Sequence, residues 1–187
     1  NRKSPLRKSK LIRPISMTAK IPFIDLSRTV KQVRPDIEGK WEDHFQNCSF
    51  VGGPSVAEFE TNLAIKLNSE YAIACANGTD AILVALQASG IKAGMKVALP
   101  NLTFWATYEA IAQLGAIPVL IDISVIDQHM DYDELCQAHN EIGLDAILFV
   151  HLFGYTSSKL EKFRSFAKEE NLKMVEDAAQ AFGIERL

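Results

Sequence analysis

The sequence predicts an α/β protein with three layers, in which helices cover both faces of a mostly parallel sheet. From residue 71 onward, short apolar segments alternate with helix-like segments. This order is typical of a parallel sheet built from right-handed crossovers. Several of the short segments are nearly continuous apolar runs, as expected for strands with both faces covered. The chain has 187 residues, 48% of them hydrophobic, which is enough for one sizeable core.

Two helices are expected before this alternation begins. A short extended segment, 21–26, leads to a helix over 34–47, with Pro35 in its first turn and an apolar face. Val51-Gly52-Gly53-Pro54 interrupts the chain. The following Ser55-Val56-Ala57-Glu58 has the spacing of a capping box and therefore opens a second helix.

Strands and helices then follow in turn. Strands are expected at 71–76, 96–99, 117–121, 145–150 and 172–175. Helices are expected at 79–89, 104–114, 131–139 and 158–171. Gly90 and Gly115 directly follow two of these helices, where glycine commonly ends a helix.

Charge and composition exclude several classes of protein. Residues 1–16 hold six basic and no acidic side chains, which leaves 14 basic and 23 acidic side chains in the rest of the chain. Such an acidic body is a poor candidate for nucleic-acid binding. Residues 1–16 could be a nucleic-acid-binding arm or a targeting peptide, but we expect a disordered basic leader or an upstream extension, with Met17 as the natural start. No apolar run reaches the length of a membrane span. Three widely spaced cysteines argue against disulfides and favour the cytoplasm.

Asn77, Gly78 and Thr79 join the first expected strand to a helix. Gly78 permits a tight turn and close approach of a ligand, and a helix N-terminus attracts phosphate through its unpaired N–H groups and its dipole. The alternative is a plain helix cap made by Asn77 or Thr79. The glycine spacing excludes a Walker loop and a dinucleotide-binding motif.

Two adjacent aromatic residues, Phe104 and Trp105, follow the next strand. Both cannot face the core, so one ring could stack on a planar ligand. The alternative is one buried ring and one half-exposed ring.

The segment 175–183, Val-Glu-Asp-Ala-Ala-Gln-Ala-Phe-Gly, places a carboxylate at the carboxyl end of a buried strand. Ligands of α/β folds bind at such ends. Asp177 could pair with a protonated ring nitrogen, and Gln180 could bind a ligand oxygen; the alternative for Asp177 is a helix N-cap. His151 ends another strand, where it is either a base or ligand-positioning group or a structural residue.

The sequence shows neither a metal-binding motif nor a serine-nucleophile motif. His44, His129 and His139 have no carboxylate or cysteine at metal-binding spacing, so we expect no metal site. The serines show no nucleophile elbow.

Taken together and in order, these segments resemble the DegT/DnrJ/StrS-type sugar aminotransferases, which belong to the fold-type-I, aspartate aminotransferase-like enzymes that use pyridoxal phosphate. The resemblance extends from Ile21 to Gly183. Its motifs are Gly52-Gly53-Pro54-Ser55, Asn77-Gly78-Thr79-Asp80-Ala81, Thr103-Phe104-Trp105-Ala106-Thr107, His151-Leu152-Phe153-Gly154 and Glu176-Asp177-Ala178-Ala179-Gln180.

The resemblance implies a pyridoxal phosphate pocket. Asn77, Gly78 and Thr79 would hold the phosphate, with Asn77 where the family often has Ser. Phe104 would stack on the pyridine ring, with Trp105 packed behind it. Asp177 would pair with the ring nitrogen and Gln180 with the ring hydroxyl, and His151 would be a candidate on the substrate side.

It also implies a reaction: transfer of an amino group from glutamate to a nucleotide-linked keto sugar, for amino sugars of surface polysaccharides or related glycans. Residues 17–187 would form the N-terminal part of the large domain, without the C-terminal small domain. The Schiff-base lysine would lie beyond Leu187, so that this chain alone would be inactive. Family members form homodimers in the cytoplasm, with no membrane or nucleic-acid partner.

Three alternatives stay open. The chain could be a degenerate or non-catalytic fragment that binds pyridoxal phosphate or a partner. It could belong to a lysine-less sugar dehydratase of the same family, with His in place of the lysine. It could belong to another fold-type-I enzyme, such as a cysteine desulfurase or an amino-acid aminotransferase, although Gly52-Gly53-Pro54 and 151–154 argue against this by resemblance.

Overall fold

A computed structural model of the chain describes residues 21–184. The expected leader, 1–16, and the expected start at Met17 lie outside these residues. The chain divides after Gly53 into two compact units. In the part that the structure describes, no helix combines the length and the apolar character needed to span a membrane.

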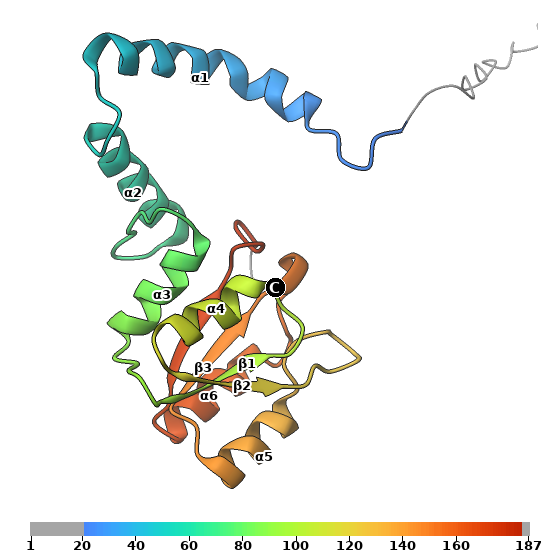
Figure 1. The fold of residues 1–187 in the computed structure, drawn as a ribbon. Coiled ribbons are helices and arrows are strands. Elements are labelled where there is room, and N and C mark those ends of the chain that lie inside the picture. The colour runs from blue at the N-terminus through green and yellow to red at the C-terminus, as the bar shows by residue number, and fades with distance from the viewer. Residues whose placement is uncertain (1–20, 185–187) are drawn as a thin grey trace, which may run out of the picture. The chain divides into compact units, whose positions relative to one another are not determined.

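The first unit holds one long helix, α1 (Ser27–Asn47), drawn in blue to cyan in Figure 1. The expected start at residue 34 is wrong, and Pro35 lies inside the helix instead of in its first turn. At the start of the helix, the Asp25 carboxylate accepts a hydrogen bond from the Ser27 N–H at 2.9 Å. It ends at Cys48, which takes the left-handed conformation (φ 49°) typical of a helix C-terminus.

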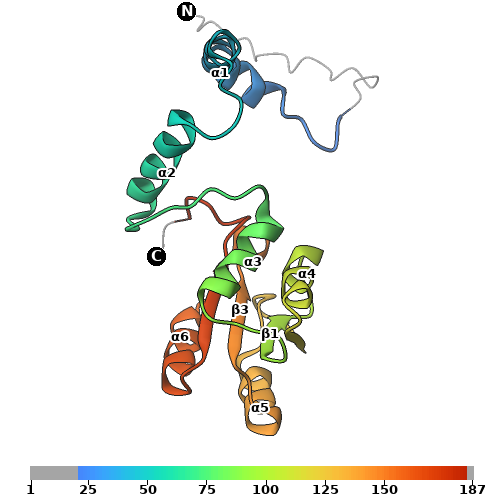
Figure 2. The ribbon, with the colours of Figure 1, turned by 60° about the vertical axis from the view of Figure 1, so that its left-hand side comes forward.

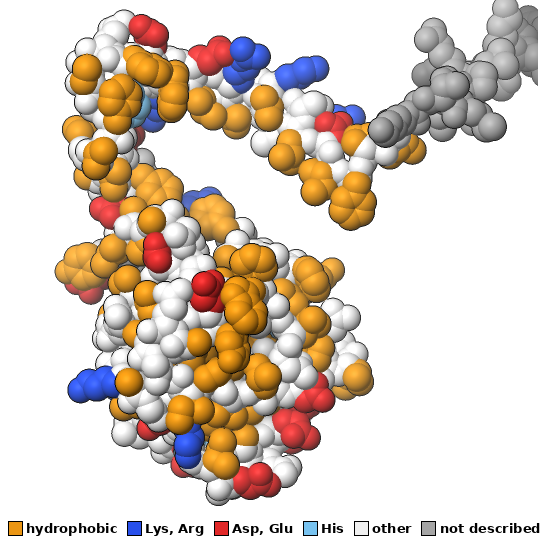
Figure 3. Space-filling model, viewed as in Figure 1, with side chains coloured by type: hydrophobic (Ala, Val, Ile, Leu, Met, Phe, Trp, Pro, Cys, Tyr) orange, Lys and Arg blue, Asp and Glu red, His pale blue; other side chains and the backbone are white. Residues whose placement is uncertain are grey.

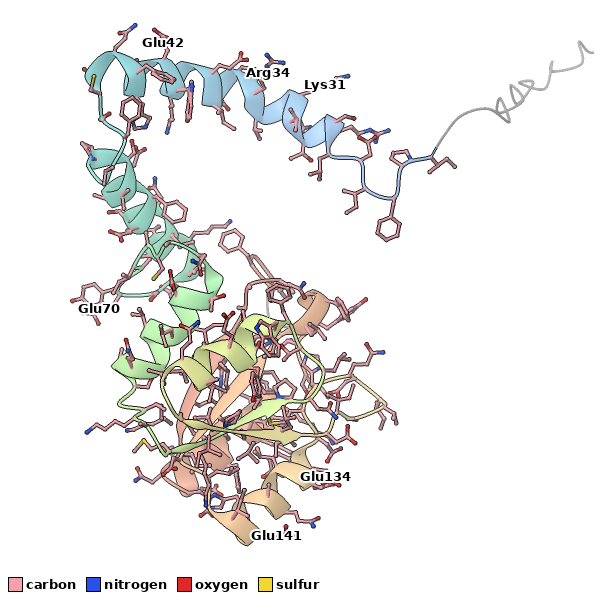
Figure 4. All side chains as sticks on the ribbon, viewed as in Figure 1. Lys31, Arg34, Glu42, Glu70, Glu134 and Glu141 are labelled. Atoms are coloured by element: carbon pink, nitrogen blue, oxygen red, sulfur yellow. The ribbon has the colours of Figure 1, made fainter. Side chains whose placement is uncertain are left out.

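Helix α1 buries none of its own side chains. Its charged residues Lys31, Arg34 and Glu42 lie along one side (Figure 4). Hydrophobic side chains cover other parts of its surface (Figure 3). These are at least 41% exposed: Val30, Val33, Ile37, Trp41 and Phe45.

The second unit is built on a four-stranded parallel sheet. Its strands are β1 (Lys96–Pro100), β2 (Ile117–Ile121), β3 (Ala146–Val150) and β4 (Lys173–Asp177). Their order across the sheet is β2-β1-β3-β4. Lys96 is in register with Ile117, and Ala146 with Lys173.

The expected strand at 71–76 is wrong, because this segment forms no regular structure. Tyr71 and Ile73 are both more than 70% exposed, and the Ala74 N–H donates to the Glu60 carboxylate instead of to a neighbouring strand. An apolar, strand-like sequence becomes a strand only where it finds a partner and a surface to pack against.

The helices of this unit start and end within a few residues of the expected positions. They are α2 (Pro54–Leu67), α3 (Gly78–Ala88), α4 (Trp105–Gln113), α5 (Tyr132–Ile142) and α6 (Leu160–Glu169), with a short 3₁₀ turn, η1 (Leu152–Gly154).

Helices lie on both faces of the sheet, which confirms the three-layer α/β/α arrangement (Figures 1 and 2). One apolar cluster joins α3 and α4 to β1 and β3, with Leu86, Leu99 and Ile111 fully buried. The other joins α5 and α6 to the opposite face, with Leu135 and Phe163 fully buried. Successive strand residues contribute to opposite clusters, as in Leu148 and Phe149.

The strand order reverses between β1 and β3. The chain passes from β1 to β2 on one side, and then returns to place β3 on the other side of β1. In open α/β sheets, the crevice outside the carboxyl ends of the strands at such a point is where ligands bind. The segments that follow β1 and β3 therefore border the expected ligand position.

Candidate functional site

A cavity of about 250 Å³ lies at this position, among the segments that follow β1, β3 and β4. It is lined by Thr103, Phe104, Val150, His151, Leu152, Asp177, Ala179 and Gln180. Four of these residues were candidates from the sequence, and they come from the segments at the ends of three different strands: Phe104, His151, Asp177 and Gln180.

Asp177 is the last residue of β4 and lines the cavity. Its carboxylate accepts a hydrogen bond from the Ala179 N–H at 3.0 Å. No helix follows within the described residues 178–184, so the alternative of a helix N-cap is wrong. The carboxylate instead stabilises a turn while keeping further acceptor capacity.

Gln180 is held by the segment after β3. Its side-chain oxygen accepts a hydrogen bond from the Phe153 N–H at 2.7 Å. Since a backbone N–H can only donate, this contact identifies which end of the amide is the oxygen. The side chain is therefore oriented with its NH₂ group available to a ligand.

Phe104 and Trp105 are both largely exposed, at 73% and 65%. The alternative of one buried ring is therefore wrong. Phe104 lines the cavity and immediately precedes α4. Trp105 packs against Tyr108, with ring centroids 5.1 Å apart, and is not among the residues that line the cavity. The structure gives no support to a Trp105 ring behind Phe104.

His151 is buried, and its Nε2 donates to the Glu176 carboxylate over 3.0 Å. The other oxygen of Glu176 accepts from the Arg164 guanidinium, with Nε at 2.8 Å and Nη2 closer still. The hydrogen bond from His151, followed by Arg164, lowers the pKa of Glu176 to about 2 although burial opposes this. Because an ionised carboxylate only accepts, Nε2 of His151 carries a hydrogen.

The second ring nitrogen of His151, Nδ1, is buried and has no hydrogen-bond partner within the described part of the chain. Buried polar atoms are usually paired, and a catalytic role is one explanation for an exception. Sequence reasoning missed Glu176 and Arg164 as partners of His151. Two acids in succession at a strand end were a visible signal for Glu176, whereas Arg164 lies on α6 with no signal in the sequence.

Asn77, Gly78 and Thr79 do not line this cavity. Asn77 caps α3: its side-chain oxygen accepts from the Asp80 N–H, and its NH₂ group donates to the Asp80 carboxylate, both at 2.9 Å. The interpretation as a helix cap is therefore correct for Asn77. The space around Gly78 is open, with no atom within 4 Å of a Cβ placed there. A phosphate site at this helix start stays a prediction.

The described residues contain no group of three or more side chains suited to hold a metal ion. Cys48, Cys75 and Cys136 are free thiols. The site is thus built from a carboxylate, an amide, an exposed aromatic ring and a partly paired histidine.

Comparison with known proteins matches residues 32–186 to the DegT/DnrJ/EryC1/StrS aminotransferase family. The chain is 34% identical to a UDP-2-acetamido-2-deoxy-3-oxo-D-glucuronate aminotransferase of Pseudomonas aeruginosa, over 87% of this chain and 45% of that protein. It is 32% identical to a 3-oxo-glucose-6-phosphate:glutamate aminotransferase of Bacillus subtilis, over 89% and 37%.

The crystal structure of NtdA from Bacillus subtilis, with bound cofactor PMP, has a TM-score of 0.85 and 32% identity, covering 95% of this chain and 40% of that one. The chain spans about half the length, or less, of the relatives that it matches. The family match nevertheless covers most of this chain and includes every residue that lines the cavity. The chain belongs to the DegT/DnrJ/EryC1/StrS aminotransferase family.

Proposed function

We propose that the protein containing this chain is a pyridoxal phosphate-dependent aminotransferase that moves an amino group from glutamate to a nucleotide-linked keto sugar. The observation that carries the proposal is one cavity at the reversal of strand order, lined by Asp177, Gln180 and Phe104 in a chain of this family.

The residues fit the cofactor. The cavity, at about 250 Å³, lies below the roughly 300–1,000 Å³ of sites for drug-sized ligands, so it suits a single ring. Asp177 can accept from a protonated ring nitrogen, and a charge-assisted bond of this kind favours the protonated form. Gln180 can donate its NH₂ hydrogens to a ring oxygen, and the exposed ring of Phe104 can stack on an aromatic face.

The phosphate is assigned to the start of α3. Asn77 holds the first turn in place, and Gly78 and Thr79 supply N–H groups at the positive end of the helix dipole. Open space around Gly78 allows a close approach. When bound, pyridoxal phosphate supplies the electron sink that stabilises a carbanion next to its ring.

The remaining parts of the enzyme are assigned by family. Residues 17–187 would form the N-terminal part of the large domain. No lysine is among the described residues that line the cavity, and we assign the Schiff-base lysine to a segment after Leu187. A homodimer in the cytoplasm is part of the same proposal. His151, with its spare Nδ1, stays our candidate on the substrate side.

The names of the relatives support the substrates. The Pseudomonas protein acts on a UDP-linked 3-oxo sugar, and the Bacillus protein is named for glutamate as well as for an oxidised sugar. Both acceptors carry a ketone on a sugar ring. We therefore assign a keto-sugar acceptor and glutamate as donor, with a nucleotide as the preferred carrier.

The test uses the gene product that contains this chain, ¹⁵N-labelled glutamate and UDP-linked keto sugars. Mass spectrometry should detect a ¹⁵N-labelled amino sugar, and Asp177→Asn should abolish its formation. Loss of water from the sugar without incorporation of nitrogen would support the dehydratase instead. Binding of pyridoxal phosphate with neither reaction would support a non-catalytic protein.

A further inference from the structure

The turn that follows β3 has a strained backbone. Phe153 and Gly154 both have positive φ, at 56° and 80°. Positive φ is unfavourable for a non-glycine residue, and it persists only where the surroundings impose it. The Phe153 ring is 63% exposed, so burial of its side chain does not explain the conformation.

Hydrogen bonds tie this turn to the segment after β4. The His151 N–H donates to the Asp177 carbonyl at 3.0 Å. The Phe153 N–H donates to the Gln180 side-chain oxygen at 2.7 Å. With its positive φ, Phe153 thus directs its N–H toward the Gln180 side chain and donates a hydrogen bond to it.

Gly154 lies against the backbone of Gln180. A Cβ at position 154 would lie 2.8 Å from the Gln180 carbonyl oxygen, closer than real Cβ atoms approach backbone. The positive φ is also one that glycine adopts without strain. Any larger residue at this position would have to displace Gln180 or the turn.

We propose that Phe153 and Gly154 are positioning residues, which hold the Gln180 amide so that its NH₂ group donates to an oxygen on the ligand's ring. An N–H donor favours an ionised oxygen over a neutral hydroxyl. Together with Asp177, which favours a protonated ring nitrogen, the turn selects a hydroxypyridine ring in its zwitterionic form. This inference rests on the proposed function, because the ligand in question is pyridoxal phosphate.

The first test compares Gly154→Ala with the control Gly94→Ala. Gly94 has nearly the same φ, 83°, but no atom lies within 4 Å of its Cβ position, and it lies before β1, away from the cavity. The dissociation constant of pyridoxal phosphate is measured by fluorescence, and the absorption spectrum of the bound cofactor is followed against pH.

Gly154→Ala should weaken binding about tenfold, the effect of losing one charge-assisted hydrogen bond. It should also raise the pH at which the ring oxygen ionises. Gly94→Ala should bind within about twofold of wild type. Equal values for the two variants would overturn the positioning role.

Gln180→Met tests the same contact without altering a glycine. It should also weaken binding about tenfold, and the double variant with Gly154→Ala should be no weaker than either single one, because both remove the same interaction. Additive losses would overturn the inference. A wild-type protein that does not bind pyridoxal phosphate would instead overturn the proposed function itself.

Discussion

Two buried histidines at the carboxyl edge of the sheet, His129 and His151, show how alike two side chains can look before their partners are compared. They are 3% and 6% exposed. Both rings contact Phe149, His129 by parallel stacking at 5.6 Å and His151 edge-on at 5.1 Å. Burial and aromatic contact therefore do not distinguish them.

The hydrogen bonds of the two rings distinguish His129 from His151. The Nδ1 of His129 lies 2.7 Å from the Asp127 carbonyl oxygen, and its Nε2 lies 3.1 Å from that of Tyr155. Both nitrogens thus face carbonyl oxygens, to one of which a neutral ring can donate, and the ring lies between the loops after β2 and β3. His151 uses one nitrogen on Glu176, while the other has no partner within residues 21–184.

Of the two histidines, the one whose ring keeps an unpaired nitrogen in the described part of the chain is the better candidate for a functional residue. His129 also borders a hollow of about 410 Å³, but its polar atoms already have partners. His151 borders the cavity of Asp177 and Gln180, and its buried Nδ1 has no partner within the described residues. We expect the first histidine to act in stability and the second at the ligand.

The largest expected effect is on stability, from His129→Leu. A buried imidazole that donates to a backbone carbonyl and packs on Phe149 would be lost, at a cost of about 1–3 kcal/mol. Urea denaturation of the gene product that contains this chain measures the loss. Affinity for pyridoxal phosphate in the folded state should stay within about twofold. A strong loss of affinity at unchanged stability would reverse the roles that we give to the two histidines.

The next effect concerns acid stability and Glu176. Its pKa in the folded state, about 2, lies below its ordinary value of 4.5, through the hydrogen bond from His151 and the charge of Arg164. The ionised pair therefore stabilises the fold above about pH 5, and this contribution is lost as pH falls toward 2. We expect about 1–2 kcal/mol, since solvent partly screens the group.

Unfolding free energies of wild type and Glu176→Gln, measured from pH 6 to pH 2, test this. The wild type should lose stability over that range by more than the variant does. The matched control is Glu161→Gln, because Glu161 also contacts Arg164, at 3.1 Å, while His151 pairs with Glu176. Identical pH curves for wild type and Glu176→Gln would contradict the pairing.

A smaller effect is expected at the start of α3. Asn77→Ala removes the hydrogen bond to the Asp80 N–H and should destabilise the protein by about 1 kcal/mol. Asn77→Ser keeps an acceptor at the cap without placing a second carboxylate against Asp80, and serves as control. Thermal or urea denaturation distinguishes the two variants. If phosphate also binds there, Asn77→Asp should weaken pyridoxal phosphate binding, because it adds a negative charge, and Asn77→Ser should not.

The smallest effect on stability is expected from Phe104→Ala. The ring is 73% exposed, so its removal should change the unfolding free energy by less than about 0.5 kcal/mol. Loss of stacking, worth about 0.5–1.5 kcal/mol, should weaken pyridoxal phosphate binding about two- to tenfold. Fluorescence titration measures the affinity. A destabilised variant with unchanged affinity would place Phe104 with His129 among the structural residues.

Much of the fold followed from the sequence, because alternating strands and helices and apolar strand segments carry local signals of hydrogen bonding and burial. The helices α3 to α6 and the four strands lie within a few residues of their expected positions. The prediction failed for 71–76, which has the composition of a strand but pairs with no strand within residues 21–184. It also failed at the start of α1, which begins at Ser27.

Local sequence patterns identify which residues end the strands of the sheet, and hence that Phe104, His151, Asp177 and Gln180 belong to one edge. How these side chains are held depends on contacts between separate elements. The Phe153 N–H on the Gln180 amide and Arg164 on Glu176 join residues 27 and 12 positions apart. Such contacts depend on the packing of separate elements, and no local pattern encodes them.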